Sequence, residues 1–340
     1  MIKRRVFLCV CAGLLLLSVA VSFALAHAPL GTGDNESLET ATFIPDPVKS
    51  WAIYAALHEG GEAQYYWFDI AAGETIHVML FKSMRLEESA FLPGFVLMGS
   101  GVSDEGTVPD YVERPAGANA FVVTGNQPAQ GTYEPFSPGT FYSLGELEIK
   151  APDSGTYYVA VFEPDMGGHY GLAVGDVESY GLAEWILIPF SLLGVYQWEG
   201  QSLALVLAPM IATVAVGAVL VGWRLKQRGT LNSVSSWLGA LAGLLFIGSG
   251  VITLFQMVYS IMLTAFGSEA VITLVFALIP VVLGVATLVL SLRGAEQHSA
   301  KTRISLIIPG AIALFMWAGL VLGPVLAIIA GIVPHPSRNR

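Results

Sequence analysis

The chain has 340 residues, of which 54% are hydrophobic and only 12% are charged. A soluble globular domain carries about 25% charged residues, so this composition excludes an ordinary soluble protein, and its apolar content excludes a disordered one. The formal net charge of −10 also argues against a nucleic-acid-binding protein, which would present a basic face.

The charges are divided unevenly along the chain. Residues 27–199 hold 24 of the 26 acidic residues and 5 of the 16 basic ones, a net charge of −19. The remainder holds 2 acidic and 11 basic residues, a net charge of +9. We therefore expect an acidic extracytoplasmic domain at 27–180, a juxtamembrane segment at 181–200 and a membrane domain at 201–340.

Residues 1–26 have the pattern of a secretory signal peptide. A basic triplet at 3–5 precedes an apolar run that ends in the small-residue cleavage site 24–26, which is the order that defines such signals. An uncleaved anchor helix is the alternative. Both cysteines, Cys9 and Cys11, lie inside this segment, so the cleaved chain would have no disulfide and no thiolate metal site.

Between residues 27 and 180, short apolar and aromatic runs alternate with turns that contain Gly, Pro, Asn or Asp. Several of these runs show the period-2 alternation of half-buried strands. Seven short strands with regular turns are typical of an antiparallel β-sandwich. The predicted strands are 50–54, 64–70, 75–81, 91–98, 141–149, 155–162 and 169–174.

Three motifs in this domain resemble those of the bacterial pre-peptidase C-terminal (PPC-like) domains. Residues 65–76 (YYWFDIAAGETI) are similar to the first motif of that family, 151–161 (APDSGTYYVAV) to the second, and 168–175 (GHYGLAVG) to the closing strand. The resemblance covers residues 35–178 and departs from the family pattern in a long insert at 99–138. It implies a jelly-roll-like β-sandwich that acts as an accessory module for carbohydrate or protein, without catalytic residues.

The chain contains no recognisable catalytic motif. The run His58-Glu59-Gly60-Gly61-Glu62 superficially resembles the HExxH motif of zinc proteases. Its last position is glutamate, however, and the paired glycines oppose the helix that the motif requires. We therefore expect a binding protein more readily than an enzyme.

Two patterns suggest a metal, although no cofactor is required. Cleavage of the signal peptide would make His27 the amino-terminal residue, and its amine and imidazole nitrogens suit copper. A second ligand would come from His77, with His58 and His169 as the alternatives. The insert also gathers carboxylates of the kind that calcium prefers, without the spacing of an EF-hand. These are Asp104, Glu105, Asp110 and Glu113.

An apolar run at 182–196 follows the acidic domain and is interrupted by Glu184 and Pro189. It is shorter than the roughly 20 residues of a membrane span, and its Trp and Tyr favour the headgroup interface. We predict an interfacial helix here, with a plain hydrophobic linker as the alternative.

Four later stretches reach the length of a membrane span. Basic residues gather in the first and third loops between them, and the positive-inside rule places these loops in the cytoplasm. We therefore predict a multi-pass plasma-membrane protein with the β-sandwich and the C-terminus both outside. The predicted spans are 203–223, 237–263, 270–292 and 304–333.

None of the four predicted spans contains Asp, Glu, Lys, Arg or His. Ion-coupled transporters usually place such groups in their spans, so their absence argues against transport. Gly239-x-x-x-Gly243 and Gly319-x-x-x-Gly323 are spacings at which helix backbones approach closely. They predict helix packing, either within the bundle or between copies of the chain.

These features together favour a membrane-anchored extracytoplasmic binding or accessory protein without a catalytic site. Its expected partners are membrane lipid and a protein of a membrane complex, with no nucleic acid, and an oligomer is compatible with the glycine motifs. One alternative is a transporter or channel component whose outer domain captures ligand. The other is a copper-binding protein that uses His27.

Overall fold

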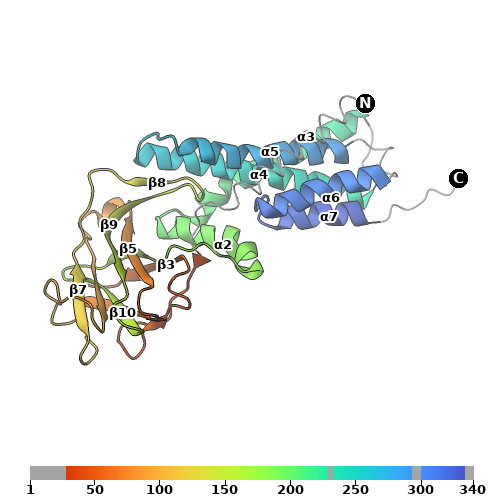
Figure 1. The fold of residues 1–340 in the computed structure, drawn as a ribbon. Coiled ribbons are helices and arrows are strands. Elements are labelled where there is room, and N and C mark those ends of the chain that lie inside the picture. Colours follow the sequence, from red (N-terminus) through yellow and green to blue (C-terminus); the bar gives the residue numbers. More distant parts are fainter. Residues whose placement is uncertain (1–27, 229–232, 293–299, 334–340) are drawn as a thin grey trace.

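The structure, a computed structural model, describes residues 28–228, 233–292 and 300–333. A β region of two sheets comes first and is followed by a helical region (Figure 1). The predicted order of a β domain and then apolar helices is therefore confirmed. The predicted signal peptide and His27 lie outside the described residues.

The first sheet has the strand order β1-β3-β11-β5-β9-β8, and the second has the order β2-β4-β10-β6-β7. All neighbouring strands are antiparallel except the short pairs β1–β3 and β2–β4. The strands are β1 (Ala28–Pro29), β2 (Thr42–Phe43), β3 (Trp51–Leu57), β4 (Glu62–Ile70), β5 (Thr75–Ser83), β6 (Gly94–Gly99), β7 (Asn119–Val123), β8 (Thr132–Glu134), β9 (Gly139–Lys150), β10 (Gly155–Glu163) and β11 (Gly168–Val174).

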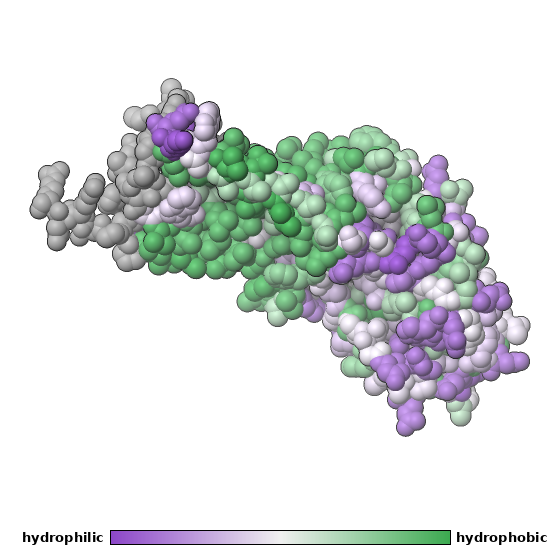
Figure 2. All heavy atoms as spheres, turned by 180° about the vertical axis from the view of Figure 1, so that it is seen from behind, coloured by the Kyte–Doolittle hydropathy of each residue, from purple (hydrophilic) through white to green (hydrophobic). Residues whose placement is uncertain are grey.

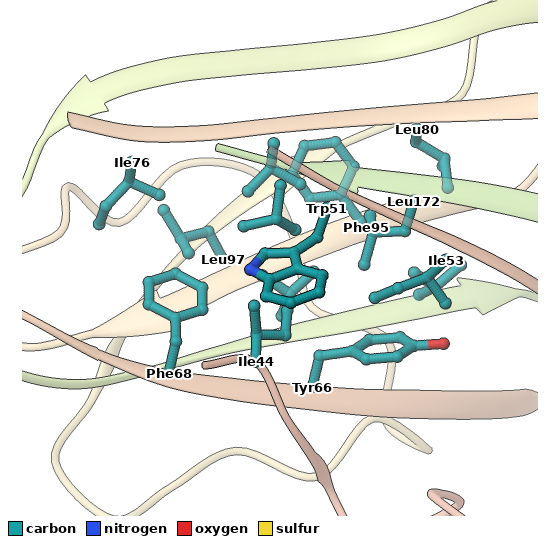
Figure 3. Packing of buried hydrophobic residues seen from close by; sticks show 14 of the residues in the cluster. Ile44, Trp51, Ile53, Tyr66, Phe68, Ile76, Leu80, Phe95, Leu97 and Leu172 are labelled. Atoms are coloured by element: carbon teal, nitrogen blue, oxygen red, sulfur yellow. The ribbon is translucent and has the colours of Figure 1, made fainter. Parts of the chain in front are cut away.

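The two sheets share one apolar core, to which both contribute buried side chains (Figure 3). Each large apolar side chain buried there stabilises the fold by about 1.5–3 kcal/mol. The core also holds a polar network, in which the hydroxyls of Tyr66 and Tyr170 lie 2.6 Å apart and Tyr170 donates to Oε1 of Gln64 at 2.6 Å. Hydrogen bonding removes the penalty of burying these hydroxyls.

The insert at 99–138 contributes two strands that the sequence does not predict. Strand β7 extends the second sheet beyond β6, and β8 pairs with β9. Beyond the sheet, the hydroxyl of Tyr133 lies 2.6 Å from Oγ1 of Thr273, and the ring of Phe136 packs against that of Phe276. The insert therefore joins the β region to the apolar helix Ala270–Ser291.

Within the described residues, the helical region contains three helices that are long and apolar enough to cross a membrane, namely α3, α4 and α5. Hydrophobic residues gather on the surface of the helical region, while hydrophilic residues gather on the β region (Figure 2). The helices are α2 (Leu182–Trp198), α3 (Leu203–Arg228), α4 (Val234–Leu263), α5 (Ala270–Ser291), α6 (Ala300–Phe315) and α7 (Leu322–Ile332).

The predicted fourth span at 304–333 does not form one helix. Helix α6 ends before a turn, and α7 returns antiparallel beside it (Figure 1). Trp317, Leu320 and Val321 adopt positive φ in this turn, a conformation that breaks a right-handed helix. At the other end, Nε of Arg303 donates to the carbonyl oxygen of Gly331 at 2.9 Å. The prediction of a four-span domain is corrected to three long helices and a helical hairpin.

This hairpin also determines at which end of the helical region α7 ends. Its turn contacts the juxtamembrane helix, because the indole N–H of Trp317 donates to the carbonyl oxygen of Trp185 at 2.8 Å. Its open end, where α6 begins and α7 ends, lies at the far end of the helical region from the β sheets (Figure 1). The end of α7 at Ile332 therefore lies away from the β sheets. The sequence, by contrast, predicts a C-terminus on the same side of the membrane as the β-sandwich.

Candidate functional site

A cavity of about 110 Å³ lies where the β region meets α2 and the turn between α6 and α7. Its wall is mainly apolar and aromatic, and two glutamates, Glu134 and Glu199, also line it. The residues come from β1, β3, β5, the β8–β9 hairpin, α2 and its C-cap, and Trp317, which are distant in the sequence. An apolar cavity with a few convergent polar groups is the usual form of a small-molecule site.

Four aromatic rings meet at this cavity. The ring of Trp198 packs edge-on against Tyr54 and Phe81, with centroids 5.1 and 5.8 Å apart, and Phe81 lies 5.2 Å from Phe141. The rings fit because residue 171 is a glycine: a Cβ there would lie 2.1 Å from the ring of Phe81. Tilted and edge-to-face pairs of this kind add about 0.5–1.5 kcal/mol to the burial energy.

Glu199 follows the last residue of α2 and is half-buried. Its Oε1 accepts a hydrogen bond of 2.9 Å from the backbone N–H of Thr140. Loss of water around the carboxyl raises the pKa of Glu199 to about 7, against the opposing effect of hydrogen bonds from Thr140 and Gln201. Burial disfavours the charged form of an acid, so this carboxyl titrates near neutral pH.

Glu134, at the end of β8, behaves in the same way. Its Oε1 accepts a hydrogen bond of 3.0 Å from the backbone N–H of Phe136. Burial raises the pKa of Glu134 to about 7, and the nearby carboxylate of Glu178 adds to the increase. Across the described part of the chain, no ion pair involves Glu134 or Glu199.

A polar connection leads from Glu199 into the helical region. The side-chain amide of Gln201 lies 3.4 Å from Oε2 of Glu199 and donates to Oε1 of Gln256 at 2.9 Å. Gln256 returns a bond of 2.8 Å to Gln201 and is fully buried in α4. The cavity is thus linked by side chains to α4, which is long and apolar enough to cross a membrane.

Helix α2 is attached to the β region at both ends. At its start, Nζ of Lys49 lies 2.7 Å from Oε1 of Glu184. At its end, Nε of Arg85 donates to the carbonyl oxygen of Trp198 at 2.8 Å, and Nη2 donates to that of Gln197 at 2.7 Å. A cation at a helix C-terminus also interacts favourably with the helix dipole.

The histidines that the copper hypothesis names do not lie in this cavity. Both ring nitrogens of His77 contact carboxylates, those of Asp176 and Glu146. These partners outweigh burial and raise the pKa of His77 above its ordinary value. His77 is therefore engaged in a surface ion-pair network, and its partner in the hypothesis, His27, is not described.

The other two histidines lie elsewhere. Nδ1 of His169 is 2.5 Å from Oε1 of Glu88. His58 joins Glu62 and Glu36 in a group whose ligand atoms all lie within 4.8 Å of one another. Among the described residues, neither His77 nor His169 belongs to this group of possible metal ligands. It is mostly exposed, as free acidic surface groups commonly are.

The acidic insert is held by protein contacts. Oδ1 of Asp104 accepts hydrogen bonds of 2.9 Å from Nη2 of Arg114 and from the backbone N–H of Ala120. Oε2 of Glu113 accepts one of 2.9 Å from the backbone N–H of Leu38. Asp104 thus braces the insert internally, and Glu113 fastens it to residue 38. The calcium hypothesis gains no grouped ligand set within the described residues.

The predicted glycine motifs have different surroundings. Gly239 and Gly243 lie on α4 against α5, and a Cβ on Gly243 would be 2.8 Å from the carbonyl oxygen of Gly284. Gly323 lies on α7 beside the ring of Phe246. Gly319, by contrast, sits in the α6–α7 turn with φ of 68°. The second spacing therefore does not form one helix face, because its first glycine provides the turn.

The residues that define the cavity were not selected by any sequence motif. Glu134 falls in the insert, and Glu199 stands between the juxtamembrane run and α3. The available signal in the sequence is that Glu199 is the last charged residue before the first predicted span, 203–223, which carries no charge. Models of known protein families give no match to this chain, and a search of curated proteins finds no relative.

Proposed function

We propose that the protein is a membrane-anchored extracytoplasmic binding protein whose ligand site is the cavity between the β region and α2. The observation that carries this proposal is the cavity itself, because its apolar wall and two half-buried carboxyls come from both regions of the chain. A purely structural contact between a domain and its anchor would be expected to exclude charged groups at its centre.

The proposed placement is the plasma membrane, with α3, α4 and α5 crossing it and the β region outside. The basic residues in the last turns of α3, Arg224, Lys226 and Arg228, support a cytoplasmic position for that end of the bundle. The hairpin α6–α7 enters from the same side and reaches α2 with Trp317. Lipid is therefore a partner of the helical region.

We further infer that the β region is a jelly-roll-like sandwich of the PPC-like type. The three sequence motifs fall on strands that are neighbours: β4 pairs with β10 in one sheet, and β5 pairs with β11 in the other. This supports a binding module more than a catalytic one. The transporter alternative receives less support, since the predicted spans that correspond to α3, α4 and α5, at 203–223, 237–263 and 270–292, carry no Asp, Glu, Lys, Arg or His.

The proposal is tested by the access of small molecules to the cavity in the full-length protein. Cys9 and Cys11 are replaced by serine, and Ser137→Cys places one thiol in the cavity wall. Methyl methanethiosulfonate, a small neutral reagent, should label it. Val195→Trp fills the cavity and should slow labelling at least about tenfold, whereas Leu187→Trp on the exposed face of α2 should not. Equal rates in all three proteins would contradict the proposed function.

A further inference from the structure

We infer that the cavity between the β region and α2 takes an organic ammonium group, carried by a small soluble amine or by a lipid headgroup. This inference rests on the proposed function, since it names the ligand chemistry of the same site. It is carried by three features of the wall: its aromatic rings, its two carboxyls and its size.

The aromatic part of the wall suits a cation. Tyr54, Phe81, Phe141 and Trp198 converge on the cavity with ring planes inclined by 57–80° to one another. All four side chains line the cavity. The face of an aromatic ring attracts an ammonium ion, and quaternary ammonium ligands are recognised by such groups of rings.

The carboxyls supply the opposite charge. Oε1 of Glu134 and Oε1 of Glu199 each accept a backbone hydrogen bond, which fixes the two groups in the wall. Neither has a cationic partner within the described chain. A half-buried carboxylate without a cation is costly, whereas the same group paired with one is not. A neutral apolar ligand would not reduce the free-energy cost of the buried negative charge, whereas an ammonium group would. The carboxylates therefore favour an ammonium ligand.

Arg85, a nearby cation, does not neutralise the two carboxylates. Arg85 lines the neighbouring cavity on the other side of Glu199. Its Nε and Nη2 are taken up by the carbonyl oxygens of Trp198 and Gln197. Arg85 also lies 3.9 Å from Glu88, another carboxylate. The remaining charged group near Glu134 is Glu178, which is negative.

The size of the cavity limits the ligand. A cavity of about 150 Å³ accommodates benzene, and this one measures about 110 Å³. It therefore takes a trimethylammonium or ethylammonium group and not a whole lipid. Trp317 in the wall comes from the hairpin of the helical region, so a headgroup at the membrane surface is one source of the ammonium and a soluble amine is the other.

The experiment uses the full-length Ser137→Cys protein, without Cys9 and Cys11, in phosphatidylglycerol nanodiscs. Choline is compared with 3,3-dimethylbutanol, a neutral molecule of nearly the same shape. Choline should slow labelling by methyl methanethiosulfonate about tenfold more than the alcohol does. The difference should vanish with Glu134→Gln and Glu199→Gln together, since glutamine keeps the acceptor for each backbone N–H. Ser103→Cys, on an exposed loop, is the control for reagent chemistry.

A second arm separates the two sources. Nanodiscs that contain phosphatidylcholine should protect the thiol at position 137 without added choline if the headgroup is the ligand, and should leave it reactive if a soluble amine is. Equal protection by choline and the alcohol, or protection by neither, overturns the ammonium inference. The proposed function survives those results if Val195→Trp still closes the cavity, so the two failures are distinguishable.

Discussion

The side-chain amides of Gln201 and Gln256 exchange two hydrogen bonds, of 2.9 and 2.8 Å, across the junction of the juxtamembrane segment and α4. Both side chains are buried, with 4% and 0% of their surface exposed. Each amide satisfies the other in a place where water is excluded. The pair thereby fixes the segment that carries Glu199 onto the helical bundle.

Removal of one member of this pair should destabilise the protein. Gln256→Leu leaves the amide of Gln201 buried without its partner, which costs about 1–3 kcal/mol. The double variant Gln201→Leu/Gln256→Leu removes both amides and should recover most of that loss. The free energy of unfolding in detergent, followed by tryptophan fluorescence, measures the cycle. A double variant as unstable as the sum of the singles would contradict the pairing.

Stability should fall as the pH rises from about 5 to about 8. The pKa of Glu199 is about 7 in the folded protein and about 4.3 when unfolded. Between these values the folded state keeps a proton that the unfolded state releases, so a rise in pH favours unfolding. The Glu199→Gln variant cannot ionise at this position. The difference between its thermal midpoint and that of the parent protein should therefore become more positive as the pH rises to 8. A constant offset at both pH values would show that Glu199 does not titrate in this window.

Two glycine substitutions should act in opposite directions. A Cβ on Gly171 would lie 2.1 Å from the ring of Phe81, so Gly171→Ala should cost about 1–3 kcal/mol through overpacking. Gly194 lies exposed on α2, and a Cβ added there would meet no atom within 4 Å. Gly194→Ala should stabilise the helix by about 0.5–1 kcal/mol. Chemical unfolding of both variants provides the test, and a neutral Gly171→Ala would contradict the packing.

The α6–α7 hairpin predicts the position of Val333. A membrane-impermeant maleimide should not label Val333→Cys on intact cells and should label it after permeabilisation. Gln227→Cys, at the same end of the bundle, should behave alike, while Ser103→Cys in the β region should be labelled from outside. Labelling of Val333→Cys on intact cells would contradict the hairpin and support the single span at 304–333 that the sequence predicts.

The strands that the sequence predicts are those with a clear alternation of apolar residues, such as β4, β10 and β11. Strands β7 and β8 escape prediction because Gly, Pro and acidic residues surround them, and their pairing with β6 and β9 fixes their bounds. The two-residue strands β1 and β2 are too short to carry a period. Local pattern therefore predicts the centre of each sheet better than its edges.

The helical hairpin and the cavity depend on features that composition does not record. The turn that ends α6 consists largely of apolar residues, among them Leu320 and Val321 at positive φ. A measure of hydropathy treats such residues as the continuation of a span. Glu134 and Glu199 become half-buried only when the β8–β9 hairpin packs on α2, so their raised pKa values follow from tertiary contacts. The apolar character of both segments is predictable, but the arrangement is not.

Because Lys49 holds the start of α2 and Arg85 holds its end, α2 and the β region form one unit and are not joined by a loose tether. Two attachment points along one helix oppose swivelling as well as detachment. In the proposed placement, the contact of Tyr133 with Thr273 and the Gln201–Gln256 pair then hold this unit at one height and one tilt above the bilayer. A partner that recognises the surface of the β region would then bind every copy of the protein in the same orientation relative to the membrane.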